Sequence, residues 1–231
     1  MKTLCTVATA AALAILIASC NSNSVNVPPQ QPAAADFLYS GKVGTVYTYD
    51  VHWKLVTKTF ADSVQREMTL RVLATDTTDA DGNRGMLLER RLPFISSPDS
   101  YATDTSWYYV KGNDVFVVTY GQLGNQSRTP ARILRVPSAV GDSISPIDGA
   151  PKTVVASTNS SIVTPAGTFS AYQLQYARSG STANNTTEEQ STIEHYSPKV
   201  NRVRVESNRI TKENGVIVFH EQLIHVLKSI R

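Results

Sequence analysis

The chain has 231 residues, of which 41% are hydrophobic and 18% are charged, so it contains enough apolar material for one hydrophobic core. Its formal net charge of +3 arises from 22 basic and 19 acidic residues that are scattered without a long run of either sign. The sequence therefore argues against nucleic acid as a partner, and it predicts one folded domain.

The first 19 residues have the features of a signal peptide. Met1 and Lys2 supply a positive start, and residues 4–17 form an apolar run that is too short to cross a bilayer as a helix. The run ends in Ile17-Ala18-Ser19-Cys20, which resembles the bacterial lipobox, where the cysteine is acylated and becomes the first residue of the mature chain. The alternative is an ordinary secretory signal whose cleavage site happens to contain a cysteine.

Cysteine usage agrees with a lipid anchor. The only other cysteine, Cys5, lies within the signal peptide, so the mature chain keeps one sulfur and can form no internal disulfide. The resemblance implies that Cys20 carries acyl chains such as palmitate, which hold a protein on a membrane without a transmembrane helix. Asn21, rather than aspartate, follows the cysteine, a pattern that resembles sorting to the outer membrane. We therefore expect a lipid-anchored protein of the bacterial cell envelope, in the outer membrane and facing the periplasm.

The segment after the cysteine predicts a flexible tether. Residues 21–35 are polar and proline-bearing, with almost no large apolar side chain that could repay the entropy of ordering. We assign residues 20–43 to the lipidated cysteine and its tether, and residues 44–231 to a single all-β domain.

From residue 44 onward, apolar and polar residues alternate with a period of two. Residues 47–55 place aromatic and aliphatic side chains on one face and polar ones on the other, which predicts a long half-buried strand. The segments Asp79–Asn83 and Lys111–Asp114 interrupt the alternation and predict hairpin turns, because glycine and asparagine tolerate positive φ.

The C-terminal half continues the same pattern. Its candidate strands are residues 131–136, 153–163, 169–178, 191–196, 200–209 and 216–228. No capped run of helical period follows the signal peptide, and a short helix within residues 56–66 is the one alternative. The sequence predicts an all-β fold, a curled antiparallel sheet or incomplete barrel of about ten strands.

One turn carries a family resemblance. Residues 163–172 (VTPAGTFSAY) resemble the TPAGTF signature of the uncharacterised DUF3108-like bacterial envelope proteins, and their proline and glycine predict a tight turn that places Val163 and Phe169 on adjacent antiparallel strands. Two further elements are similar to those proteins, although Ile144 replaces a usual tryptophan and Asn201 a usual glycine. Asparagine is the least costly replacement at a left-handed position. By looser analogy, the resemblance implies a similarity to the half-barrel lipoprotein carriers of the LolA and LolB type, in which a curled sheet holds acyl chains.

The polar residues predict no catalytic or metal site. His220 and His225 are five residues apart, so a strand sends them to opposite faces, whereas a zinc-binding HExxH motif needs a spacing of four on a helix. Asp79, Asp81 and Asn83 lack the remaining ligands of a calcium loop and predict a plain turn. Because the chain has no nucleophile elbow and no glycine-rich phosphate loop, we expect no enzyme, no metal and no cofactor.

The aromatic residues of the predicted strands have two interpretations. Tyr47, Tyr49, Trp53 and Trp107 either fill the core or line an apolar groove for a ligand. The first hypothesis is therefore an envelope lipoprotein that binds an apolar or lipid-like ligand. The alternative is a structural or interaction subunit that contacts another envelope protein and has no small-molecule ligand. An inner face that is open, rather than plugged by its own side chains, would favour binding.

Overall fold

The computed structural model describes residues 31–79, 81–94, 100–121, 129–146, 152–182 and 185–231, and residues 31–231 form one compact unit. The described residues build one twelve-stranded antiparallel sheet. The all-β prediction is confirmed, with slightly more strands than the expected ten. The signal peptide and Cys20 lie outside the described residues.

The strands of the N-terminal half are β1 (Val46–Thr57), β2 (Ala61–Thr78), β3 (Arg84–Pro93), β4 (Tyr101–Lys111), β5 (Asp114–Gly121) and β6 (Ala131–Arg135). Those of the C-terminal half are β7 (Ser143–Ile144), β8 (Thr153–Thr164), β9 (Gly167–Thr182), β10 (Thr186–Ser197), β11 (Asn201–Glu213) and β12 (Val216–Ile230). The first and last strands pair in the middle of the sheet, where Val51 lies opposite His225. From this pair the chain meanders outward on both sides, in the order β6-β5-β4-β3-β2-β1-β12-β11-β10-β9-β8-β7.

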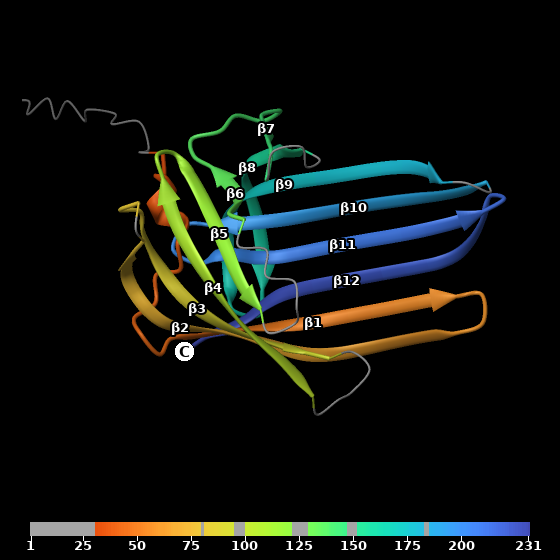
Figure 1. Cartoon of the computed structure of the whole chain (residues 1–231), viewed down its shortest axis with the longest axis horizontal. Helices are drawn as coiled ribbons and strands as arrows, with labels where there is room; N and C mark the ends of the chain where they lie inside the picture. The colour runs from red at the N-terminus through yellow and green to blue at the C-terminus, as the bar shows by residue number, and fades with distance from the viewer. Residues whose placement is uncertain (1–30, 80, 95–99, 122–128, 147–151, 183–184) are drawn as a thin grey trace, which may run out of the picture. The chain divides into compact units, whose positions relative to one another are not determined.

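The sheet curls most strongly at one end. There its two outermost parts approach each other, and the backbone N–H of Arg132 on β6 donates to the carbonyl of Pro146, just after β7, at 2.8 Å. At the other end, β1 and β9 to β12 extend side by side beyond the curled part of the sheet, and we call these strand ends the open arms (Figure 1). The result is a nearly closed narrow end and an open end.

A short 3-10 helix, η1 (Ala34–Phe37), blocks the narrow end. Phe37 is fully buried and packs edge-on against Tyr172, with ring centroids 5.3 Å apart, and Tyr39 is 3% exposed. The assignment of all residues 20–43 to a tether is therefore corrected, because the folded domain begins by Ala34. Burial of the large side chains that follow the polar stretch offsets the entropy of ordering this segment.

The turns confirm the local predictions. Pro165 and Ala166 connect β8 to β9, and Ile162 pairs with Phe169 across the resulting hairpin. Gly112 and Asn201 have positive φ values of 60° and 61°, so the asparagine occupies a left-handed position as expected. The segment 56–66 forms the end of β1, a turn and the start of β2 rather than a helix.

Candidate functional site

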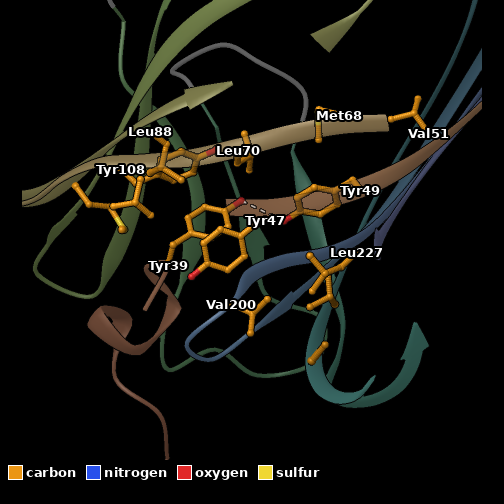
Figure 2. Close-up of a cluster of buried hydrophobic side chains, with 14 residues drawn as sticks. Tyr39, Tyr47, Tyr49, Val51, Met68, Leu70, Leu88, Tyr108, Val200 and Leu227 are labelled. Atoms are coloured by element: carbon orange, nitrogen blue, oxygen red, sulfur yellow. Dashed lines mark hydrogen bonds between the residues drawn. The ribbon is translucent and has the colours of Figure 1, made fainter. Parts of the chain in front are cut away.

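The inner face of the narrow end is filled by the protein's own side chains. Tyr39 packs against the rings of Tyr47 and Tyr108, with centroids 4.7 Å and 5.3 Å away (Figure 2). The hydroxyl of Tyr49 donates to the carbonyl of Arg202 at 2.7 Å, and burial raises the pKa of this phenol. Tyr47 and Tyr49 are each 1% exposed. These two tyrosines therefore belong to the core, as one interpretation of the sequence had it.

A second buried cluster surrounds Phe37 and continues the filling toward β5 to β10. Its other members are Ala34, Val115, Leu134, Val136, Ile144, Val155, Tyr172, Leu174 and Tyr196. Asn201 ties η1 to the start of β11, because its side-chain amide donates to the carbonyl of Phe37. The narrow end is thus plugged by the protein's own side chains.

The two tryptophans lie outside the tyrosine cluster. Trp53 is half-buried on β1, where its indole N–H donates to Glu221 Oε1 at 2.9 Å. Trp107 stacks on Tyr109 with centroids 4.3 Å apart and donates to Thr77 Oγ1 at 2.9 Å. Its neighbour Tyr108 belongs to the tyrosine cluster, so Trp107 points to the other face of β4. The structure therefore does not bring the four predicted lining residues together in one cavity.

A hollow of about 360 Å³ lies beside η1, and we call it the η1 pocket. Its lining residues are Ala35, Leu38, Tyr39, Thr75, Asp76, Arg84, Gly85, Met86 and Val110. Of these, Thr75, Asp76 and Arg84 are exposed and form a polar rim, on which the Arg84 guanidinium pairs with Asp76 at 2.7 Å. The remaining side chains are mostly apolar. Sequence reasoning missed this pocket because it had placed residues 35–39 in the tether.

A group of charged side chains borders the tyrosine cluster on the inner face, and we call it the charged layer. It consists of Arg66, Arg90, Asp104, Glu194, Arg202 and His225. Arg90 forms a two-pronged ion pair with Asp104, and Arg202 pairs with Glu194 at 3.5 Å. Burial, followed by the charges of Arg202 and Arg90, lowers the pKa of His225 to about 3, so this imidazole is neutral at physiological pH.

The remaining polar candidates have structural roles. His220 faces away from His225 and shares a 2.7 Å hydrogen bond with Asn208, which confirms that the two histidines lie on opposite faces. The carboxylate of Asp79 accepts hydrogen bonds from the backbone of Asp81 and Asn83 at 3.0 and 2.8 Å, as the plain turn requires. Within the described ranges, no three histidine, cysteine or acidic side chains form a group suited to a metal ion.

Comparison with known proteins shows the fold and no more. No protein-family model and no curated protein matches the chain. A crystal structure of a provisionally described lipoprotein from Parabacteroides distasonis is similar, with a TM-score of 0.51 and 18% identity over 84% of this chain and 98% of that one. A provisionally described exported protein with a YmcC-like fold from Bacteroides fragilis has a TM-score of 0.48 and 13% identity over 84% and 99%. The resemblance to DUF3108-like proteins stays a prediction.

The part of the chain that the structure describes contains no helix that is both long and apolar enough to span a membrane.

Proposed function

We propose that this protein is a lipid-anchored protein of the bacterial envelope whose folded domain holds an apolar or lipid-like ligand in the η1 pocket. The carrying observation is the mostly apolar hollow of about 360 Å³ beside the buried plug. Ligand-binding cavities typically have volumes of about 300–1,000 Å³, with apolar walls and a few polar groups that orient the ligand.

The size and lining of the pocket favour one acyl chain over a whole phospholipid. A volume near the lower limit of ligand cavities suits a single short chain, which would contact Leu38, Tyr39 and Met86. Arg84 on the rim is 72% exposed and can receive a carboxylate or another polar end group at the mouth. The proposal assigns binding to the chain and no chemical step, so it needs neither a metal nor a cofactor.

The anchor and the location rest on the N-terminal sequence. The lipobox-like Ile17-Ala18-Ser19-Cys20 supports acylation of Cys20, and Asn21 supports placement in the outer membrane facing the periplasm. The similar structure from Parabacteroides distasonis is described as that of a lipoprotein, which supports the lipid anchor and an envelope location. The acyl anchor would keep the η1 pocket close to a source of lipid, and the membrane is then the first partner of this protein.

Uptake of dodecanoate by the mature chain without residues 1–20 tests the pocket. We expect native mass spectrometry to show one bound chain, and Thr75→Trp to weaken binding at least tenfold by filling the rim. Thr78→Trp is the matched control, because Thr78 is exposed on the same strand and does not line the pocket. An unliganded wild-type protein, or equal loss in both variants, would contradict the proposal.

The plugged interior favours a second function, that of a structural or interaction subunit. Tyr47, Tyr49 and Phe37 have at most 1% of their surface exposed, so the narrow end offers no larger cavity along these residues. A protein that takes up no dodecanoate and copurifies in a fixed ratio with another envelope protein would establish this alternative. Crosslinking in intact cells, followed by purification of the anchored form, is the measurement.

A further inference from the structure

The charged layer lies on the inner face where the open arms meet the filled narrow end. Val51 of β1 pairs with Arg66 on β2 and with His225 on β12. Directly opposed residues of antiparallel strands share a face, so Arg66 and His225 lie on the two sides of the buried Val51. Besides burial, the charges of Arg202 and Arg90 lower the pKa of the same imidazole.

Positive charge exceeds negative charge in this layer. Both carboxylates already have a partner: Asp104 accepts two hydrogen bonds from Arg90 Nε at 3.0 and 3.1 Å, and Glu194 pairs with Arg202. The second oxygen of Glu194 also accepts a hydrogen bond from the Tyr196 hydroxyl at 3.0 Å. The layer contains three arginines, Arg66, Arg90 and Arg202, and only two carboxylates. The charge of Arg66 therefore has no counterpart within the layer.

Two hydrogen-bonding atoms of the layer are buried without a partner among the described residues. They are Nε of Arg66 and Nδ1 of His225. Leaving a buried polar atom unpaired costs about 1–3 kcal/mol, and more when the group is charged. A neutral imidazole can donate one N–H, and a guanidinium forms strong charge-assisted hydrogen bonds to oxyanions. Nε of Arg66 therefore fits an acceptor that brings negative charge, and Nδ1 of His225 fits the same acceptor in the tautomer that carries its proton there.

Solvent reaches the charged side chains that neighbour Arg66 and His225. The side chains of Arg90 and Asp104 are 30% and 14% exposed, and those of Arg202 and Glu194 are 23% and 26% exposed. A layer that is partly screened from water strengthens the interaction between a guanidinium and an anion relative to the open surface.

We infer that the charged layer binds an oxyanion, a carboxylate or a phosphate group, through Arg66 and His225, with Arg90 and Arg202 supplying positive charge around it. The pairs with Asp104 and Glu194 hold these two arginines in place. None of the four binding residues lines the η1 pocket, so the inference does not depend on that pocket. The oxyanion is either free in solution or the head group of an amphipathic ligand whose chain lies along the open arms.

Calorimetric titration of the mature chain without residues 1–20 with phosphate, acetate and dodecanoate, at constant ionic strength, tests the inference. Arg66→Gln should weaken binding of the recognised anion at least tenfold. Arg71→Gln is the matched control, because it removes the same charge from the exposed outer face of the same strand and should leave binding within about twofold. Circular dichroism verifies that each variant is folded, and the NMR signal of the His225 ring should shift when the anion binds.

The outcomes separate the sources of the anion. Binding of phosphate or acetate that is lost in Arg66→Gln establishes a site for a free oxyanion. Dodecanoate binding that needs Arg66, without acetate binding, establishes the head group of an amphipathic ligand. Binding that is weakened by Thr75→Trp and not by Arg66→Gln would support the η1 pocket and overturn this inference. No binding of any of the three, or equal loss in both arginine variants, would overturn it as well.

Discussion

His225 should make the stability of the folded domain depend on pH in a defined window. Burial, together with Arg202 and Arg90, lowers the pKa of its imidazole from 6.5 to about 3. In the unfolded chain the residue binds a proton below about pH 6.5, whereas the folded protein keeps it neutral until about pH 3. The unfolded state therefore binds more protons between these values, and stability is lost as the pH falls through this window. Above it, the residue contributes no pH dependence.

The size of the effect follows from the same values. At about pH 5 the unfolded state gains about 2 kcal/mol from protonation of His225, since each pH unit below its pKa contributes about 1.4 kcal/mol. When the pH is lowered from about 7.5 to about 5, the free energy of unfolding measured in urea should therefore fall by about 2 kcal/mol less in His225→Gln than in the wild type. His52→Gln, at an exposed position on β1, should lose as much as the wild type.

The comparison isolates His225 because His195, whose pKa burial also lowers, is present in every variant. An equal loss of stability in His225→Gln and wild type would refute the assignment of His225 to a screened position among positive charges. A higher denaturant midpoint of the variant at both values of pH, with an unchanged difference between them, would lead to the same conclusion.

Three further predictions concern the plug, a turn and the anchor. Phe37→Ala should lower the free energy of unfolding by about 3–5 kcal/mol, because it empties a fully buried site, whereas Phe60→Ala at an exposed tip should change it by less than about 0.5 kcal/mol in urea unfolding. Asn201→Gly should lower the free energy of unfolding by about 1 kcal/mol, because it removes the hydrogen bond to the Phe37 carbonyl. Asn201→Ala should lower it by about 1–2 kcal/mol more, because the φ of 61° at this position suits glycine and not alanine. Calorimetry ranks the two variants, and the reverse order would contradict the reasoning. Cys20→Ala should leave an uncleaved precursor or release the protein, and an unmodified mature N-terminus at another residue in mass spectrometry would disprove the anchor.

The architecture could be predicted wherever neighbouring residues decide the conformation. Alternation along residues 47–55 identified the strand and its buried face, and Gly112 and Pro165 identified turns that the structure contains. Asn201 was recognised as a left-handed position from its resemblance to a usual glycine. These are local properties, because side-chain period and backbone φ depend on residues close in the chain.

The side chains of β4 that point to the inner face of the sheet could not be predicted in the same way. Trp107, Tyr108 and Tyr109 are consecutive and all aromatic, so alternation does not say which of them faces inward. Tyr108 joins the tyrosine cluster, while Trp107 and Tyr109 stack on the other face. Only the register of β4 on β3, where Tyr108 lies opposite Met86, decides the orientation, because a shift of one residue exchanges the faces.

The sequence by itself determined the lipobox-like N-terminus, the all-β class and the positions of the turns, since each depends on a short stretch of residues. Only the tertiary structure placed β1 beside β12, put Phe37 into the narrow end and gathered Arg66, Arg90, Arg202 and His225 on one inner face. These contacts join residues far apart in the chain. They arise from the curl of the whole sheet and from which of its ends is filled, and neither property is recorded in the pattern of any single strand.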